Sequence, residues 1–164
     1  MIDQSLIPPA LGIVGLIAAF AIYGIVKAYD EGSDALKKIA DQIHIGAMVF
    51  MRREYTLLAL FSAVLLVLIS ITDLGIYTAA AFLAGALSSA CAGWIGMYAA
   101  TKANVRTTNA AHTKGQADAL SVAFFGGSIM GLAVASLGLL GLGLVYYFFG
   151  GDPHMAHHIH GFGM

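Results

Sequence analysis

The segment that decides the fold is "GWIGMYAATKANVRTTNAAHTKGQ", which runs from Gly93 to Gln116. Within a few positions, small apolar residues give way to Lys102, Asn104 and Arg106. Such a change is typical of a helix that leaves a lipid bilayer. It raises two questions: where the other membrane spans lie, and whether the polar side chains do more than mark the membrane boundary.

The composition of the chain indicates a membrane protein. Its 164 residues are 59% hydrophobic and 10% charged, whereas soluble domains carry about 25% charged residues. The net charge of −1 gives no reason to expect a nucleic-acid partner.

Four uncharged runs locate the predicted spans. Each is long enough for a transmembrane helix, which needs about 20 residues. We therefore predict an all-α polytopic fold with four transmembrane helices, at about 6–28, 54–72, 75–101 and 118–149. The first run lacks a basic start and a cleavage site of small residues, so it is not read as a removable signal peptide.

The basic residues orient the predicted spans. All eight Lys and Arg lie between the first and second spans or between the third and fourth. By the positive-inside rule, segments 29–53 and 102–117 are predicted to be cytoplasmic and both termini to lie outside. An even number of spans agrees with termini on one side.

Local signals refine the first two helices. Pro8 and Pro9 suit the first turn of a helix, Gly32 is a helix breaker, and Ser33 is a candidate N-cap. From there apolar residues recur at three- and four-residue steps, which predicts one long amphipathic helix running into the second span. Asp34 and Lys38 stand four apart, in the order that favours an ion pair.

Small residues recur every four positions in the third and fourth spans. In the third span they form the stripes Gly85, Ser89, Gly93 and Ala92, Gly96, Ala100; in the fourth span Gly127 and Gly131 stand four apart and are followed by Gly138, Gly141 and Gly143. Such stripes let helices approach closely in lipid. The partner is either another span of this chain or a helix outside it. The single cysteine, Cys91, is expected to be a small buried residue, with a reactive thiol as the alternative.

The carboxylates argue against chemistry within the membrane. All nine Asp and Glu lie at or beyond the span ends, whereas ion-translocating helices hold ionisable groups inside the bilayer. This disfavours a self-contained ion channel and a rotary-ATPase proteolipid. Asp30, Asp34 and Asp41 lack a phosphate-binding glycine loop and read as a solvated helix face. We assign no catalytic, cofactor-binding or metal-ligating residue.

Two further groups of residues could have a function: the histidines, and polar side chains at the ends of two spans. His154, His157, His158 and His160 near the C-terminus could ligate zinc, nickel or copper, or simply form an exposed loop. His44 and His112 are expected to be structural. Charged and amide side chains at the cytoplasmic ends of two spans are the candidates for bracing loops. These candidates are Arg53, Glu54, Asn104 and Arg106.

Three motifs together resemble a known family. They are "GAMVFMRREY" (46–55), "GWIGMYAATKANVRTTNAA" (93–111) and "ALSVAFFGGSIMGL" (119–132). Their order and spacing resemble the first four helices of the membrane-bound, ion-translocating inorganic pyrophosphatases. The match covers residues 46–132; outside it the similarity is one of hydrophobicity and topology.

The resemblance implies a larger parent protein. Such enzymes hydrolyse pyrophosphate with Mg²⁺ on the cytoplasmic side, export H⁺ or Na⁺, and form homodimers. Their substrate- and metal-binding residues lie downstream of the matched region. This chain is then an outer-ring scaffold, inactive alone, in a prokaryotic cell membrane, packed against the parent's remaining helices and the lipid bilayer. The transported ion and any K⁺ dependence stay open. Arg106 and its neighbours are expected to brace loops of the catalytic core.

One alternative from another class remains, namely a free-standing four-helix membrane scaffold or interaction subunit without catalysis. The chain itself can be a truncation, a split subunit or a fragment.

Overall fold

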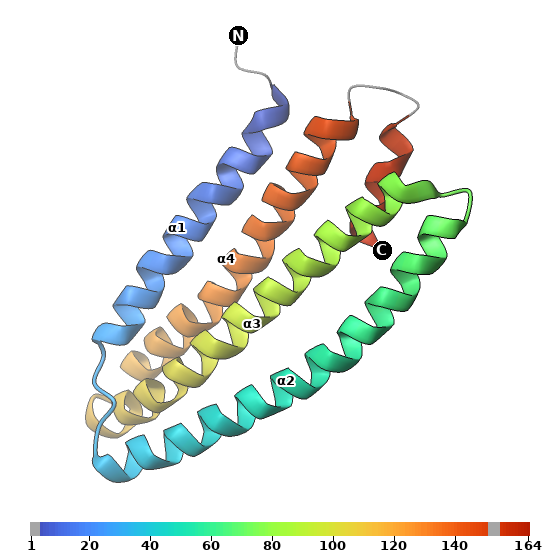
Figure 1. Cartoon of the computed structure of the whole chain (residues 1–164). Coiled ribbons are helices and arrows are strands. Elements are labelled where there is room, and N and C mark those ends of the chain that lie inside the picture. Colours follow the sequence, from blue (N-terminus) through green and yellow to red (C-terminus); the bar gives the residue numbers. More distant parts are fainter. Residues whose placement is uncertain (1–3, 151–154) are drawn as a thin grey trace.

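Four long helices run up and down beside one another in the computed structural model, which describes residues 4–150 and 155–164 (Figure 1). They are α1 (Ile7–Ala28), α2 (Asp34–Ile71), α3 (Gly75–Thr113) and α4 (Gln116–Phe149), with short 3-10 helices η1 (Gln4–Leu6) and η2 (Ala156–Gly163). All four α-helices are long and apolar enough to cross a membrane. The predicted all-α fold with four candidate spans is confirmed.

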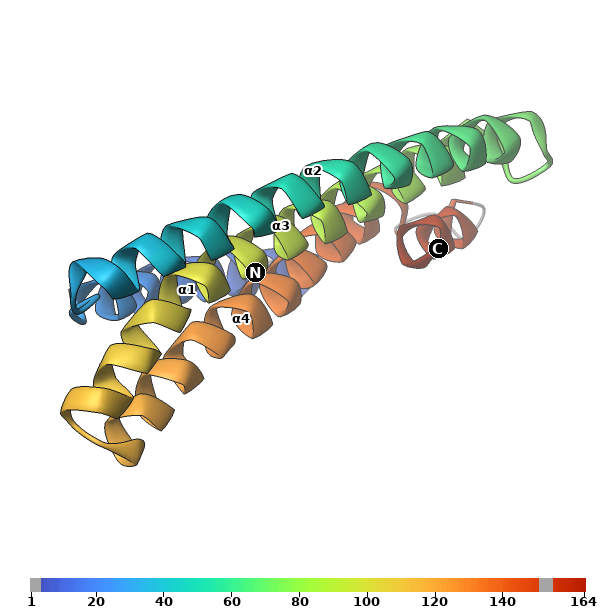
Figure 2. The same cartoon turned by 90° about the horizontal axis from the view of Figure 1, so that it is seen from below.

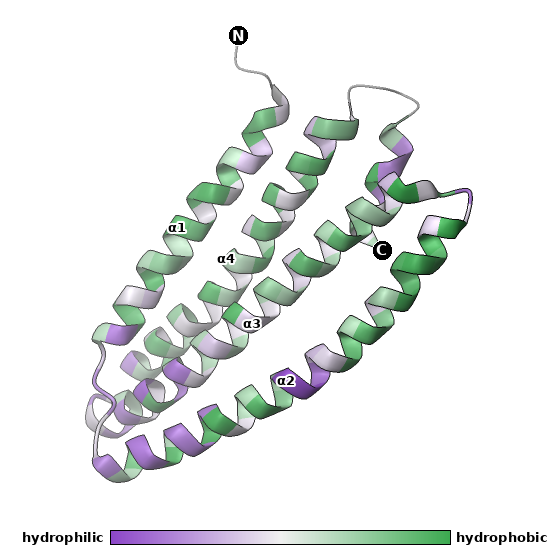
Figure 3. Cartoon of the chain, in the orientation of Figure 1, coloured by the Kyte–Doolittle hydropathy of each residue, from purple (hydrophilic) through white to green (hydrophobic). Residues whose placement is uncertain are grey.

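The helices lie in the order α1, α4, α3, α2 (Figure 1). Seen from below, α2 lies on the side of α3 that faces away from α4 (Figure 2). The α1–α2 and α3–α4 connections share one end of the bundle, and hydrophilic residues gather there (Figure 3). We call it the basic end. The α2–α3 turn and η2 lie at the opposite end. Which end faces the cytoplasm stays a prediction of the positive-inside rule.

The helix boundaries follow the local signals. The two prolines occupy the first positions of α1. Gly32 has a φ of 82°, a conformation that glycine adopts without strain, and the Ser33 hydroxyl caps α2 by accepting a hydrogen bond from the Leu36 N–H (3.4 Å). α2 is a single long helix, as predicted. Its Asp34 pairs with Lys37 (3.6 Å), so the predicted Lys38 partner is wrong; both side chains are exposed, and such a pair stabilises little.

α3 continues well past the last residue of its predicted span, Thr101. Beyond it, the hydroxyls of Thr107, Thr108 and Thr113 each donate to the carbonyl four residues earlier, so these side chains bond within the helix. Helix length alone does not locate the membrane surface. The predicted span boundaries therefore stay predictions.

Small residues bring the helix backbones close together. Gly96 of α3 lies against Met130, and Gly126 of α4 lies against Ala103. At Gly12 of α1, a Cβ atom would come within 2.6 Å of the Ser136 carbonyl oxygen. Contact at this distance leaves no room for a side chain, so the α1–α4 seam requires glycine there.

The predicted glycine stripe of α4 is only partly correct. A Cβ atom on Gly141 or Gly143 would collide with a neighbour, but one on Gly127, Gly131 or Gly138 would meet nothing within 4 Å. These three glycines lie off the seams that α4 makes with α1 and α3. The sequence allowed one other packing partner for such glycines, namely a helix outside this chain.

Cys91 is exposed, so the expectation of a buried residue is wrong. Its neighbour Ala92 is the residue that packs inside, with 4% of its surface exposed. One position along a helix is a rotation of about 100°, and that rotation takes Cys91 off the packed face.

Candidate functional site

A buried arginine at the basic end joins α3 to the α1–α2 connection. Arg106 is 6% exposed. Its Nε donates to the Tyr29 carbonyl (3.1 Å), its Nη1 donates to the Lys102 carbonyl (2.7 Å), and its Nη2 lies 2.8 Å from Glu31 Oε1. All three guanidinium nitrogens are engaged, which uses the fork geometry that distinguishes Arg from Lys.

Asn109, about one helical turn further along α3, adds a second contact with the same connection. Its Nδ2 donates to the Asp30 carbonyl (3.2 Å), and its Oδ1 lies beside Gly32. The Asp30 carboxylate accepts the Gly32 N–H (3.0 Å), which closes the loop on itself. We call Tyr29, Asp30, Glu31, Arg106 and Asn109 the Arg106 brace.

The charges of the brace are partly shielded from solvent. The exposed fraction is 7% for the Arg106 side chain and 37% for the Glu31 side chain. A buried charge is tolerated when it is paired and hydrogen-bonded, and bonds to a charged donor contribute about 1.5–3 kcal/mol. Arginine keeps its proton in proteins, so the brace holds a loop in place and does not transfer protons.

The four candidate bracing residues have different surroundings. Arg106 contacts a loop of this chain, whereas the sequence pointed to loops outside it; that wider role stays a prediction. Asn104 is exposed and lines a groove of about 460 Å³ between α2, α3 and α4. Arg53 is exposed and Glu54 is half-buried; in residues 4–150 and 155–164 neither forms an ion pair. The structure does not bring these three into the brace.

Apart from Tyr29 and Asp30, which accept through their backbone carbonyls, two brace residues were not among the candidates. Asn109 stands three positions after Arg106, and that spacing places both on one helix face, so the signal was available. Glu31 had no such signal, because its pairing with Arg106 spans 75 residues of chain and depends on how the α1–α2 loop folds back.

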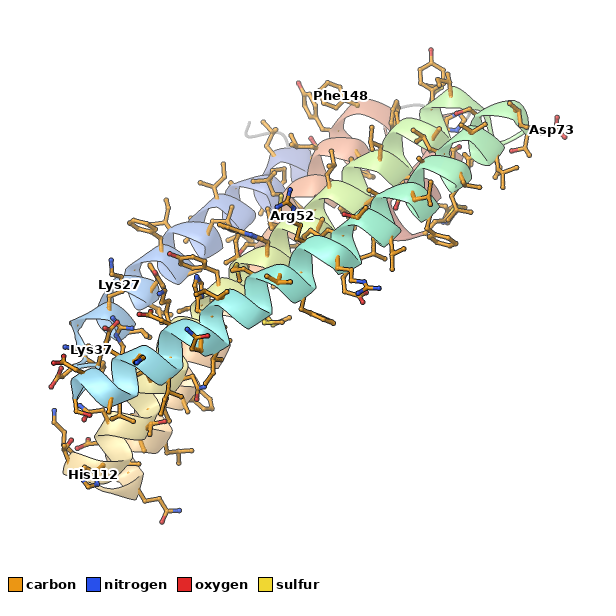
Figure 4. All side chains as sticks on the ribbon, turned by 60° about the horizontal axis from the view of Figure 1, so that its bottom comes forward. Lys27, Lys37, Arg52, Asp73, His112 and Phe148 are labelled. Atoms are coloured by element: carbon orange, nitrogen blue, oxygen red, sulfur yellow. The ribbon has the colours of Figure 1, made fainter. Side chains whose placement is uncertain are left out.

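Two further polar contacts join α2 to α3. The Tyr55 hydroxyl donates to the Ala90 carbonyl (2.6 Å). His44 Nδ1 lies 2.8 Å from the Thr101 hydroxyl, which is the structural role expected for His44. His112 is exposed at the basic end, as is Lys37 in the first turn of α2, whereas Asp73 marks the opposite end (Figure 4).

One tail histidine is buried at that opposite end. His158 in η2 is 8% exposed, and its Nδ1 lies 2.7 Å from the Thr78 hydroxyl of α3. Removal from water, followed by the nearby His157, lowers the pKa of His158 below its usual value. This contact docks η2 on α3.

The described residues do not form a metal site. No three His, Cys, Asp or Glu side chains converge anywhere in the part of the chain that the structure describes. His154 lies outside the described residues, so metal binding by the tail stays a hypothesis. For Mg²⁺, which prefers octahedral oxygen ligands, these residues offer no fitting donor set, and we derive no step of hydrolysis through them.

Four apolar helices, close backbone seams and charges at or beyond the apolar runs define a polytopic helical membrane protein. Inorganic H⁺ pyrophosphatase is the family that matches, over residues 13–164, and the chain belongs to it. The predicted resemblance is confirmed.

Several named pumps are similar to this chain. A K⁺-insensitive pyrophosphate-energized proton pump of Methanosarcina mazei is 43% identical over 144 residues, which is 87% of this chain and 21% of that protein. A K⁺-stimulated pyrophosphate-energized sodium pump of Thermotoga maritima is 42% identical over 142 residues, covering 84% of this chain and 19% of that protein. The chain thus spans about a fifth of the length of these relatives.

Proposed function

We propose that this chain is a scaffold segment of a pyrophosphate-energized ion pump. The parent protein hydrolyses inorganic pyrophosphate to phosphate in the cytoplasm and couples this reaction to export of H⁺ or Na⁺ across a prokaryotic cell membrane. The observation that carries the proposal is the family match over residues 13–164 in a chain without a donor set for Mg²⁺ among its described residues.

Catalysis is assigned to the rest of the parent. Hydrolysis of a phosphoanhydride with Mg²⁺ needs several carboxylates that converge on the metal ions. We propose that these ligands come from helices outside this chain, and that the parent works as a homodimer. The relatives include K⁺-insensitive proton pumps and a K⁺-stimulated sodium pump, so both ions stay within the proposal.

The Arg106 brace gives the scaffold a specific task. It ties the α1–α2 connection to the end of α3 with three contacts, at the end where the positive-inside rule places the cytoplasm. We propose that this rigid platform supports the cytoplasmic loops that carry the parent's substrate site.

A chimera tests the proposal. The matching segment of the Methanosarcina mazei pump is replaced by this chain, and pyrophosphate hydrolysis and proton uptake are measured in inverted membrane vesicles. We expect both activities to be retained. The same measurement on membranes that hold this chain alone is expected to show no Mg²⁺-dependent hydrolysis.

Two outcomes would contradict the proposal. Turnover by the chain alone would place catalytic residues within it. A chimera that folds and inserts but neither hydrolyses nor pumps would favour the free-standing scaffold or interaction subunit.

A further inference from the structure

We propose that the groove between α2, α3 and α4 receives a membrane helix from the part of the pump outside this chain, and that this helix carries a basic side chain that pairs with Glu54. The groove has a volume of about 460 Å³, and its lining includes Ile43 of α2, Asn104 of α3 and Gly127 of α4. This inference rests on the proposed pump function and names the face on which the scaffold meets the rest of the pump.

Glu54 lies on the face of α2 that borders this groove. It follows Ile43 by eleven positions, which is three full turns of an α-helix and about 20° more, so the two side chains share a face. Arg53 and Arg52 stand about 100° and 200° away around the helix and lie off that face. Glu54 is half-buried, and within residues 4–150 and 155–164 its carboxylate has neither an ion-pair partner nor a hydrogen-bond donor.

The packing of α2 on α3 places Glu54 beside an apolar part of α3, although in the sequence it stands at the end of an apolar run. The hydroxyl of its neighbour Tyr55 donates to the Ala90 carbonyl (2.6 Å), so this part of α2 lies beside residue 90. The uncharged run of α3 continues from there to Thr101, eleven residues further toward the basic end. Eleven residues of an α-helix extend about 16 Å, so the Glu54 carboxylate lies well inside the apolar part of the bundle.

The helices α4 and α1 are apolar at the same level. Gly141 of α4 lies against Ser88 of α3, and Ser136, five positions earlier in α4, lies against Gly15 of α1. Because α3 and α4 run antiparallel, Ser136 is then level with about residue 93 of α3, beside the Glu54 turn of α2. Gly15 is the middle of the uncharged run 4–26. Figure 3 shows the hydrophilic band midway along α2, and Figure 4 places Arg52 away from both ends of the bundle.

A carboxylate at this level needs a partner. Ionisable side chains within a membrane are costly, and they pair with one another or face the interior of a helical bundle. The chain covers 21% of the length of the Methanosarcina mazei pump and 19% of the Thermotoga maritima pump, so about four-fifths of such a pump lies outside it. Since a cation complements a carboxylate, we assign the partner of Glu54 to a Lys or Arg side chain in that remainder.

The α4 wall of the groove favours a helix over a lipid chain as the occupant. Ala123, Gly127, Gly131 and Ala135 stand at four-residue steps, and all four are exposed. A Cβ atom on Gly127 or Gly131 would meet nothing within 4 Å. Small residues at this spacing let a second helix backbone approach closely in lipid. One helix in the groove would therefore pack against α4 and reach Glu54 on α2.

A substitution on the α4 wall tests the helix contact. Gly131→Leu is made both in the 164-residue chain and in its chimera with the Methanosarcina mazei pump. The space around Gly131 is open in the chain, so unfolding of the chain in detergent micelles should occur at the same or a higher temperature. In the chimera the leucine would hold the docked helix away, so the half-life of pyrophosphate hydrolysis on heating should fall. Gly24→Leu is the matched control, because Gly24 of α1 is also surrounded by open space but lies outside the groove, and it should leave that half-life unchanged.

Charge variants test the ion pair. In the chimera, Glu54→Gln is expected to shorten the half-life of activity on heating about tenfold, the effect of losing one bond between charged groups, and Glu54→Lys should shorten it further by placing two cations together. Neither variant should lower the stability of the chain alone, where Glu54 has no partner among the described residues. Asp41→Asn is the matched control: it makes the same charge change at an exposed position of α2, on the side away from the groove, and should leave both proteins unchanged.

Three outcomes would overturn the inference. An active chimera that tolerates both Gly131→Leu and Glu54→Gln would show that lipid covers this face. Equal losses in the variants and in their controls would assign the effects to the scaffold in general. If the variants instead abolish energy transfer between two labelled copies of the chain in bilayers, the groove binds a second copy. A chimera without these substitutions that neither hydrolyses nor pumps would refute the proposed function itself, so the two failures are distinguishable.

Discussion

The two ends of the bundle hold their peripheral segments by different chemistry. At the basic end, a charged Arg106 and the amide of Asn109 bind the carbonyls and carboxylate of the α1–α2 loop. At the opposite end, η2 packs on α3 and α4 through apolar and aromatic contacts, and its His158 forms a hydrogen bond with Thr78.

The difference concerns strength and sensitivity to pH. A guanidinium keeps its charge at every pH that a protein survives, and bonds to a charged donor exceed those between neutral groups. An imidazole changes charge near neutral pH. We therefore expect the brace to be strong near neutral pH, and the docked η2 to be weaker and sensitive to pH.

The largest expected effect is at the brace. Arg106→Ala removes three interactions and leaves the Tyr29 carbonyl and the Glu31 carboxylate without this donor, so we expect a loss of about 2–3 kcal/mol in unfolding free energy. Unfolding in detergent micelles measures it. Arg53→Ala, at an exposed arginine, should change stability by less than about 0.5 kcal/mol. Equal effects of the two variants would remove any special role for the brace.

The next largest loss of stability is expected from a substitution in the loop that the brace holds. Gly32 has a φ of 82°, where an L-residue costs about 1–2 kcal/mol. A Cβ atom there would also lie 2.5 Å from Asn109 Oδ1. Gly32→Ala should therefore destabilise the chain. Gly46→Ala is a control with the opposite sign, because Gly46 lies in helix α2 with open space around it and gains helix propensity of up to about 1 kcal/mol. A harmless Gly32→Ala would show that the brace tolerates other loop shapes.

A smaller effect is expected at the other end. The Thr78 hydroxyl donates to the Leu74 carbonyl (2.6 Å), so its oxygen accepts the Nδ1–H of His158. Thr78→Val keeps the shape but removes this acceptor, which is expected to cost about 1 kcal/mol. Hydrogen exchange of residues 156–163 should rise while exchange at the brace stays unchanged. Thr108→Val, at an exposed threonine, is the control. Unaltered exchange in η2 would show that apolar packing alone docks this segment.

The smallest effect is the pH dependence of the same contact. Burial lowers the pKa of His158 in the folded chain, so the folded state favours the neutral ring. The resulting stabilisation is complete above the usual histidine pKa of about 6.5 and is lost as the pH falls through the lowered value. Hydrogen exchange of η2 should therefore increase below about pH 6.5, and His158→Gln should abolish that increase. If hydrogen exchange rose at low pH around the brace and not in η2, the expected difference in pH sensitivity between the two ends would be wrong.

Much of the fold could be predicted because membrane insertion imposes simple rules. Apolar length identifies a span, basic residues identify an end, and Pro8, Gly32 and Ser33 mark helix boundaries through backbone chemistry that acts locally. Each of these signals lies within a few residues of the feature that it predicts.

The packing partners could not be predicted in the same way. The glycines of α4 repeat along the helix, yet Gly126 packs and Gly127 does not, because one position rotates a side chain by about 100°. Cys91 was misplaced for the same reason. Which of several similar faces turns inward depends on the neighbouring helices.

The Arg106 brace also combines residues that the sequence could indicate with partners that it could not. Arg106 and Asn109 stand out in the sequence as polar residues at one helical spacing after a membrane span, and their side-by-side placement follows from the geometry of α3 alone. Glu31 and the carbonyls of Tyr29 and Asp30 join them only after the chain has returned through two membrane helices.

The amino-acid sequence by itself thus determined the helices, their number, their family and the end at which the cations gather, because solvation by lipid and local backbone preferences act on contiguous residues. Only the tertiary structure decided that a buried guanidinium holds the α1–α2 loop, that His158 of η2 bonds to Thr78, and that Glu54 lies beside the apolar part of α3. These features join residues far apart in the chain, and their contacts exist only once the helices have packed.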